Sequence, residues 1–192
     1  MIDWKEEAPD LRVIPFSEFP LHRLNINYNE FINYLDKEYF IFFCPYAWDK
    51  MWKHGRSSFK EVGGLLIGFV YKYKDRFIWY IDEIVFNNDF EHSFSHVILY
   101  PSLWQDANAI ILNQQGTPEK FILGWYHTHP RFTPFFSSTD QNTHTHFFNF
   151  DYSLGIVFDP YSEQILFYVG GNTKLYTDKL LICELFKKED RV

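Results

Sequence analysis

Two long apolar runs, separated by a short polar turn, constrain the fold of this chain more than any other feature. Residues 61–73 (EVGGLLIGFVYKY) and 76–86 (RFIWYIDEIVF) are rich in β-branched and aromatic side chains, and Lys74 and Asp75 stand between them. This pattern predicts a β-hairpin. Aromatic residues make up 21% of the chain, which favours strands packed by large flat side chains over a helical bundle.

The segments around this hairpin predict further strands and helices. Strands are expected at the apolar runs 38–45, 120–129, 152–160 and 163–171, of which the last two should form a second hairpin. Helices are expected at 45–55, at 101–116 and from about residue 139 onward. The stretch 179–192 fits a strand or a helix equally well. This order predicts an α/β (α+β) fold in which a mixed central β-sheet is flanked by helices.

Local signals predict where two of these helices end or begin. Gly55 is expected to end the first helix, and His54 in its last turn is expected to complement the helix dipole. Ser138 and Gln141 match a capping box, so the third helix should begin near Thr139.

The length of the chain fits one domain. A chain of 192 residues can bury roughly 70% of the surface that it exposes when unfolded. No internal repeat or long linker divides it. Residues 1–35, which contain several prolines, are expected to form an N-terminal lead-in arm, and residues 36–192 the folded domain.

Charge and cysteine usage exclude several classes of protein. A net charge of −7 argues against a binder of the nucleic-acid backbone, which needs clustered cations. Cys44 and Cys183 have apolar neighbours and no CxxC spacing, so we expect both to be core residues in a reducing compartment. No run approaches the ~20 apolar residues that a membrane span needs. A cytoplasmic location, without membrane or nucleic-acid partners, is therefore expected.

Two His-x-His pairs occur, and only one is expected to bind a metal ion. Residues i and i+2 of a strand point to the same face, about 6.6 Å apart, so His127 and His129 at a strand end can converge on one ion. His144 and His146 fall in a predicted helix, where such residues point about 200° apart. We therefore interpret each of these two as a surface or satisfied core histidine.

Three further residues complete a candidate hydrolytic site, and each has a simpler alternative. Asp140 suits a third metal ligand in the first turn of a helix, or is only a helix-start acid. Glu61 suits a general base for a metal-activated water, or is only a strand-edge acid beside Lys60. Ser137 suits a donor to a developing oxyanion, or is one more capping hydroxyl.

The segment HTHPRFTPFFSSTD resembles the His-x-His-Pro-x6-Ser-x-x-Asp signature of the JAMM metalloproteases, also called the MPN or JAB (Mov34/PAD-1) family. The upstream EVGGLLIG is similar to the Glu-bearing strand of that family, and GWYHTHP and SSTD are especially similar to its endosomal zinc deubiquitinases. The resemblance extends from about Phe40 to Gly171. It implies a mixed sheet flanked by helices, similar to that of the cytidine deaminases.

The resemblance also implies an activity and a role for each site residue. It implies a zinc-dependent isopeptidase or peptidase that cuts after the C-terminal glycine of ubiquitin or a ubiquitin-like modifier. His127, His129 and Asp140 would bind one Zn²⁺, Glu61 would be the general base, and Ser137 would stabilise the oxyanion. The modifier tail would lie extended beside a strand, in a groove for which the candidate lining residues are Trp125, Phe132, Phe135 and Phe136, although these aromatics serve packing equally well.

Some positions depart from the endosomal enzymes. Asn142 stands where they have a histidine for a second, structural zinc, and no cysteine lies between Cys44 and Cys183. The chain is also compact, which makes it similar to the prokaryotic JAB-type proteins. That similarity implies E1-like and E2-like partners in defence or sulfur-carrier pathways.

Two other functions remain open from the sequence. One is a catalytically silent MPN scaffold for protein assembly, although such relatives have usually lost a ligand or the glutamate. The other is a JAB-type metallohydrolase that acts on a substrate other than a modifier, such as a small peptide or a nucleic acid, although the net charge of −7 argues against nucleic acid.

Overall fold

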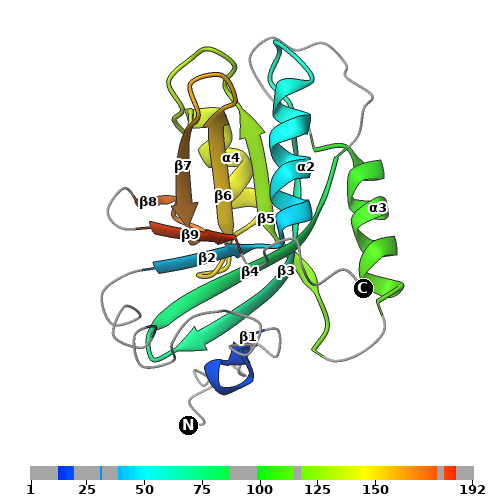
Figure 1. Ribbon diagram of the computed structural model, residues 1–192, viewed down its shortest axis with the longest axis vertical. Coiled ribbons are helices and arrows are strands. Elements are labelled where there is room, and N and C mark those ends of the chain that lie inside the picture. Colours follow the sequence, from blue (N-terminus) through cyan, green and yellow to red (C-terminus); the bar gives the residue numbers. More distant parts are fainter. Residues whose placement is uncertain are drawn as a thin grey trace, which may run out of the picture.

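The structure, a computed structural model, describes residues 13–19, 31, 39–86, 99–114, 118–176 and 180–184. It contains one mixed sheet with helices on both faces (Figure 1), so the predicted fold class is confirmed. The strands follow the order β8-β7-β6-β5-β3-β4-β2-β9, and β1 also pairs with β3. The described strands are β1 (Val13–Pro15), β2 (Tyr39–Phe43), β3 (Gly63–Tyr73), β4 (Arg76–Val85), β5 (Phe121–Thr128), β6 (Leu154–Asp159), β7 (Gln164–Val169), β8 (Lys174–Tyr176) and β9 (Leu180–Glu184). The described helices are the 3-10 helix η1 (Phe16–Glu18) and the α-helices α2 (Pro45–Arg56), α3 (Pro101–Leu112) and α4 (Ser138–Phe147).

Both predicted hairpins are present. β3 and β4 pair antiparallel across the turn at Lys74, whose φ of 56° is left-handed, and β6 and β7 pair antiparallel as well. The ambiguous last segment contains the strand β9, which pairs parallel with β2. The surroundings of the Cys183 side chain lie outside the described part of the chain. Cys44 is half-buried at the start of α2 and packs against the main core.

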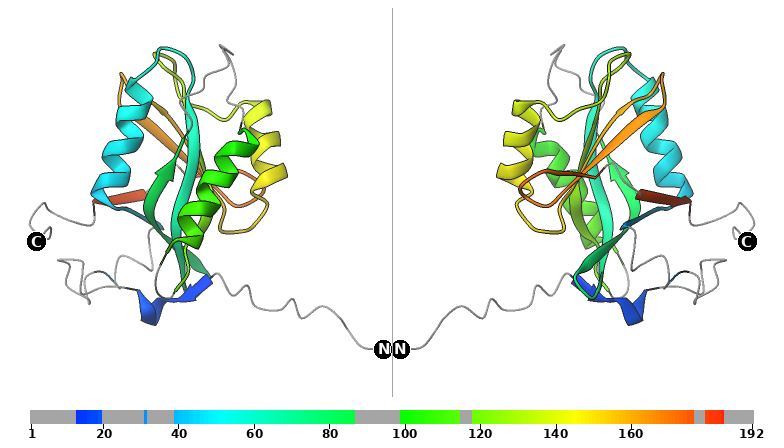
Figure 2. Two further views of the ribbon diagram at one scale, coloured as in Figure 1. Left: turned by 90° about the vertical axis from the view of Figure 1, so that its right-hand side faces the viewer. Right: turned by 90° about the vertical axis from the view of Figure 1, so that its left-hand side faces the viewer.

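The sheet separates two cores. Helix α2 covers one face, and α3 and α4 cover the other (Figure 2). Ala47 and Met51 of α2 pack into the first core, with strand residues that include Tyr126, Ile156 and Phe158. Leu103 and Ala107 of α3 pack into the second, with a different set of strand residues that includes Leu65, Trp125 and Val157. Successive residues of β5 and β6 thus alternate between the two cores, as the pleat of a strand requires.

A third, aromatic cluster packs the described N-terminal residues onto the sheet. β1 pairs with residues 70–72 of β3, beyond the stretch of β3 that pairs with β5. The cluster consists of Ile14, Phe16, Phe19, Phe31, Phe40, Phe42, Tyr71, Ile78 and Tyr80. The part of the lead-in arm that the structure describes therefore adds to the sheet and its packing. The division at residue 35 stays a prediction.

Two glycines allow close approaches that no other residue would permit. Gly124 has a φ of 157°, and a Cβ there would meet the carbonyl oxygen of Leu154 on the neighbouring strand β6. A Cβ on Gly55 would overlap the ring of Phe158 at 2.7 Å. The prediction that Gly55 ends the first helix is wrong, because α2 continues to Arg56 and Gly55 instead lets the helix lie close to the sheet. The second helix, expected to reach residue 116, ends at Leu112.

His54 does not carry a charge that complements the helix dipole, contrary to the prediction. It lies in the last turn of α2 but is buried. Its Nδ1 is hydrogen-bonded to the hydroxyl of Tyr126 at 2.8 Å, and its ring stacks on that of Phe86 with the ring centroids 3.7 Å apart. Burial, together with the nearby charge of Lys50, lowers the pKa of His54 from 6.5 to about 4. The ring is therefore a neutral part of the core at physiological pH.

None of the described helices is long and apolar enough to cross a membrane.

Acid should destabilise the chain through His54. Above pH ~6.5 His54 is neutral in the folded and in the unfolded chain. Between pH ~6.5 and ~4 only the unfolded chain takes up the proton, which favours unfolding. The free energy of unfolding should therefore fall by up to about 3 kcal/mol across this range. Denaturant titrations of metal-free protein at several pH values should show a smaller fall for His54→Phe than for wild type. His146→Phe, at an exposed position of α4, should keep the wild-type fall. Equal falls in all three proteins would contradict the assignment.

Candidate metal centre

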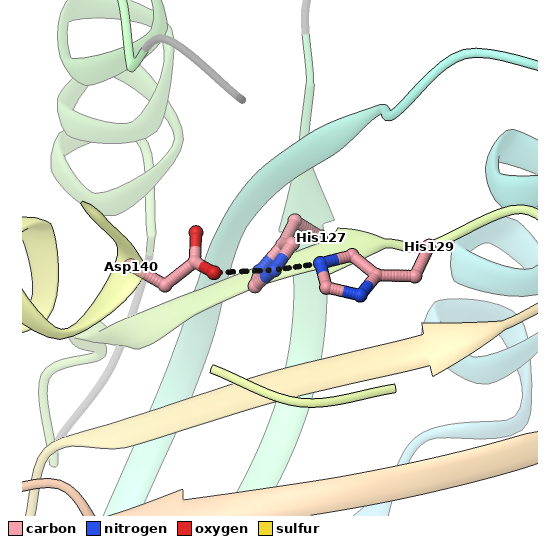
Figure 3. A group of neighbouring side chains, drawn as sticks. All are labelled: His127, His129 and Asp140. Atoms are coloured by element: carbon pink, nitrogen blue, oxygen red, sulfur yellow. Dashed lines mark hydrogen bonds and ion pairs between the residues drawn. The ribbon is translucent and has the colours of Figure 1, made fainter. Parts of the chain in front are cut away.

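Three buried side chains meet where the end of β5 faces the first turn of α4. The Nε2 atoms of His127 and His129 lie 3.2 Å apart, and Oδ2 of Asp140 lies 3.5 Å from Nε2 of His127 (Figure 3). One ligand atom from each residue lies within 4.8 Å of the other two. The convergence expected from the strand and helix spacing is therefore present.

The donor set fits a divalent cation. Two imidazole nitrogens and one carboxylate oxygen, with a fourth position left open, are the ligands typical of a catalytic zinc site. All three side chains are buried, which favours an ion that satisfies their lone pairs. With both imidazoles unprotonated at Nε2, the two nitrogens and Oδ2 of Asp140 would direct three lone pairs at one small region. These residues can hold a zinc ion.

Backbone contacts fix the two histidines. His127 stands opposite Gly63 of β3 and Val157 of β6, so it is held from both sides within the sheet. His129 follows β5, and its N–H donates to the carbonyl oxygen of Phe158 at 2.9 Å. Burial, and the adjacent His127, lower the pKa of His129. A neutral imidazole is the form that binds metal.

A reciprocal capping box orients Asp140. The N–H of Asp140 donates to Oγ of Ser137 at 3.2 Å, and the N–H of Ser137 donates to Oδ2 of Asp140 at 2.7 Å. The prediction that Ser138 and Gln141 form this box is wrong by one residue, because α4 begins at Ser138 with Ser137 as its N-cap. Although burial alone would raise it, hydrogen bonds from His127 and Ser137 lower the pKa of Asp140 to about 2.

Glu61 lies beside the three candidate ligands. Its Oε1 is 3.7 Å from Nε2 of His129, and it precedes β3 by two residues. Burial, and then the negative charge of Asp140, raise the pKa of Glu61 to about 7. A carboxyl group that titrates near neutrality can accept and release protons under physiological conditions.

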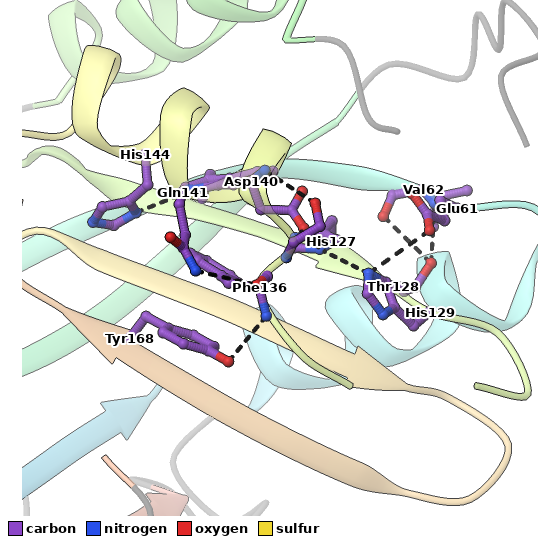
Figure 4. Close-up of polar contacts among 12 residues, drawn as sticks. Glu61, Val62, His127, Thr128, His129, Phe136, Asp140, Gln141, His144 and Tyr168 are labelled. Atoms are coloured by element: carbon purple, nitrogen blue, oxygen red, sulfur yellow. Dashed lines mark hydrogen bonds and ion pairs between the residues drawn. The ribbon is translucent and has the colours of Figure 1, made fainter. Parts of the chain in front are cut away.

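Thr128, which the sequence interpretation passed over, ties Glu61 to the histidines. Its Oγ1 accepts from the N–H of Val62 at 3.0 Å, and its own N–H donates to the carbonyl oxygen of Val62 at 2.9 Å (Figure 4). The residue after Glu61 is thus held against the residue between His127 and His129. A hydroxyl residue inside a His-x-His pair was the only signal for this role in the sequence.

The four aromatics expected in a substrate groove divide into two pairs. Phe132 and Phe135 are exposed, with 62% and 43% of their surface accessible. The centroids of their rings lie 6.3 and 5.0 Å from the centroid of the His129 ring. Trp125 and Phe136 are buried (1% and 5%), because they belong to the core beneath α3 and α4. Of the two roles that the sequence left open for these aromatics, packing is the one that the burial of Trp125 and Phe136 supports.

The remaining histidine pair behaves as expected. His144 is a buried core residue with both ring nitrogens hydrogen-bonded, and His146 is exposed.

Comparison with known proteins assigns this chain to a family. A family model described as JAB1/Mov34/MPN/PAD-1 ubiquitin protease matches residues 45–152, which is more than half of the chain and includes Glu61, both histidines, Ser137 and Asp140. The chain belongs to this family. The family assignment confirms the resemblance seen in the sequence.

Relatives of this JAB/MPN-family chain include proteasome subunits. It is 34% identical over 131 residues to the 26S proteasome non-ATPase regulatory subunit 14 of Caenorhabditis elegans, covering 67% of this chain and 40% of that protein. It is 33% identical over 114 residues to the 26S proteasome regulatory subunit RPN11 of Candida glabrata, covering 58% of this chain and 35% of that protein. The chain thus spans well under half the length of these relatives. The likeness to the endosomal enzymes stays a prediction.

A solved structure shares the fold. The solution structure of protein DSY2949 from Desulfitobacterium hafniense superposes with a TM-score of 0.57 at 16% identity, covering 75% of this chain and 93% of that one.

The capping box predicts the cost of changing Ser137. Ser137→Ala removes the oxygen that accepts the Asp140 N–H and should lower the free energy of unfolding by ~1 kcal/mol, whereas Ser137→Gly, a tolerated N-cap, should cost only a few tenths. Chemical denaturation of metal-free protein measures both. Ser138→Ala, at the exposed first residue of α4, should be nearly neutral. A larger loss for Ser138→Ala than for Ser137→Ala would move the cap back to Ser138.

Proposed function

We propose that this protein is a zinc-dependent isopeptidase or peptidase that cleaves after the C-terminal glycine of a ubiquitin-like modifier. The observation that carries the proposal is the meeting of His127, His129 and Asp140, with the carboxyl group of Glu61 3.7 Å from His129. Membership of a family described by a ubiquitin protease supports it. The folded domain at residues 36–192 would contain the whole site.

Each residue would have a distinct role in the hydrolysis of an amide. His127, His129 and Asp140 would hold the zinc ion, which when bound supplies Lewis-acid chemistry by polarising a carbonyl group and lowering the pKa of a water molecule. Glu61 would take the proton from the attacking water and pass it to the leaving amine, which its raised pKa permits. The hydroxyl of Ser137 would donate to the oxyanion. Its Oγ accepts from the backbone N–H of Asp140, so the hydroxyl proton would be left to point toward the substrate.

The exposed aromatics suit the recognition of an extended peptide tail. Phe132 and Phe135 stand beside His129, where the residues next to a scissile bond would pass. Their rings contact each other at 5.9 Å and form an apolar wall. A modifier tail ending in glycine is narrow and would lie along such a wall as an added strand. Ubiquitin-like substrates, together with E1-like and E2-like proteins that attach them, are the partners that this activity implies.

A silent scaffold is the weaker alternative. Burying polar and ionisable side chains costs folding free energy. A scaffold has no need of three buried metal-ligand side chains with a glutamate of raised pKa beside them, whereas a hydrolase does.

Metal content and hydrolysis test the proposal together. Wild type should bind about one zinc ion per chain and cleave a ubiquitin-type isopeptide or a linear modifier fusion; the ratio of the two rates distinguishes deconjugation from precursor maturation. His127→Ala should lose the zinc. Glu61→Gln should keep the zinc but lose at least ~10²-fold in kcat, because no group is left to move the proton.

Glu83→Gln is the matched control for the Glu61 variant. Glu83 is also a half-buried glutamate, but it lies on β4, away from the three ligands. Its Oε1 forms an ion pair with Nζ of Lys50 on α2 at 2.8 Å. Its replacement should leave zinc content and kcat near wild type. Full activity in Glu61→Gln, or in zinc-free His127→Ala, would refute the proposed mechanism.

The pH dependence of hydrolysis should report Glu61. The base acts only when ionised, so kcat/KM should rise with pH through the pKa of Glu61, which is about 7 without metal. The charge of a bound cation favours the carboxylate, so the midpoint in zinc-loaded enzyme should lie at or below that value. Initial rates at saturating zinc across pH 5 to 8 measure this limb. A rate that increases on acidification would contradict the assignment of Glu61 as the base.

A further inference from the structure

His144 uses both ring nitrogens to connect α4 with the strand β5 and with the turn that follows β7. The indole N–H of Trp125 donates to Nδ1 of His144 at 3.1 Å, and the Nε2–H of His144 donates to the carbonyl oxygen of Gly170 at 3.1 Å. These two contacts fix one neutral tautomer, with the proton on Nε2. His144 lies one helical turn after Asp140 on α4, so the same helix face carries both (Figure 4).

Trp125 transmits this anchor to a candidate metal ligand. Its indole stacks on the ring of His127, with centroids 4.7 Å apart and planes 16° apart, as expected for residues i and i+2 of one strand. Phe136 and Phe148 pack against the same indole, with ring centroids 5.6 and 6.5 Å from its own. The plane of the indole and the plane of the His127 imidazole are thus nearly parallel and in contact.

Among the described residues, none supplies the hydrogen bond that normally orients a metal-bound imidazole to His127. Such a ring usually donates its second N–H to a carboxylate, a carbonyl group or water. In the described part of the chain, Nδ1 of His127 is buried and has no hydrogen-bond partner. Ring contacts therefore hold this imidazole: Trp125 stacks on it at the shortest centroid distance, Phe136 also packs against it with centroids 5.5 Å apart, and the indole is itself hydrogen-bonded to His144.

We propose that His144 is a positioning residue of the metal centre, which aims His127 at the ion by fixing the indole of Trp125. This inference rests on the proposed zinc site. Its expected size is that of other outer contacts of metal ligands, a 10- to 100-fold change in metal affinity on removal.

The environment keeps His144 in the form that this role requires. Burial lowers the pKa of His144 from 6.5 to about 4, although the hydrogen bond to Gly170 acts in the opposite direction. The ring is therefore neutral near pH 7, and its Nδ1 lone pair remains available to the indole N–H.

The variants separate this role from plain core packing. His144→Leu keeps an apolar side chain but removes both hydrogen bonds, whereas His144→Gln can supply an acceptor and a donor again. Trp125→Phe keeps an aromatic ring but removes the indole N–H. Trp79→Phe is the control, since Trp79 is also fully buried and its indole N–H donates to the Tyr152 carbonyl oxygen at 2.7 Å in the other core.

Zinc affinity, measured by competition with a chromophoric chelator, is the first readout. His144→Leu should bind zinc at least ~10-fold more weakly than wild type, and His144→Gln should recover most of the loss. The control Trp79→Phe should bind as wild type even if it unfolds at a lower temperature. In the Trp125→Phe background, adding His144→Leu should change affinity much less than it does in wild type, because the connecting N–H is already gone.

The second readout needs no metal. The carbon-bound ring protons of His127 lie over the indole, so in metal-free wild type their NMR signals should be shifted by its ring current. The shift should be kept in His144→Gln and reduced in His144→Leu.

The outcomes decide the two proposals separately. Unchanged zinc affinity and an unchanged ring-current shift in His144→Leu would overturn the positioning role, while zinc binding and hydrolysis by wild type would still support the proposed function. A wild type that binds no zinc would refute the proposed function, and the ring-current shift would still test His144. If His144→Leu does not fold, a wild-type zinc affinity in Trp125→Phe would overturn the role.

Discussion

The site depends on the pairing of β3 with β5, and on how that pairing ends. Gly63 stands opposite His127, and one step further Val62 and Thr128 exchange hydrogen bonds through the backbone and the threonine hydroxyl. Because of this register, Glu61 comes to lie beside His129 although 68 positions separate them in the numbering of the chain. A slip of one residue would turn Glu61 to the other face of the sheet. The hydrolytic arrangement is therefore a consequence of strand register.

The alternation of β5 lets one strand serve the core and the site together. Tyr126 points toward α2, where its hydroxyl meets His54, while Trp125 and His127 point toward α3 and α4. Thr128 lies again on the side of α2, within reach of Gly55. The polar side chains are thus interleaved with large apolar ones, and each is fixed by close packing on both sides. Such packing limits the rotamers of the ligand side chains, which a precise metal geometry requires.

The sequence predicted what depends on local periodicity and missed what depends on packing between elements. The i, i+2 spacing of His127 and His129, and the place of Asp140 in the first turn of a helix, were enough to predict that the three side chains could meet. The burial of Trp125 and Phe136 was not predictable, because it depends on which face α3 and α4 cover. His54 was misinterpreted for the same reason: the end of α2 lies against Tyr126 and Phe86 and not in solvent. Ser137 and Ser138 offered equivalent capping signals, and only the geometry of α4 separates them.

Asp140 couples the folding of α4 to the charge of the site. Its Oδ2 accepts the N–H of Ser137 and also faces His127, so one oxygen caps the helix and belongs to the metal-ligand group. The hydrogen bonds that keep this carboxylate ionised also begin the helix that carries His144, one turn further on. From there the chain of contacts returns through Trp125 to His127. The helix start, the indole and the first histidine therefore form a closed loop of contacts. These contacts attach a short helix with few apolar residues to the sheet at two points, one at Asp140 and one at His144.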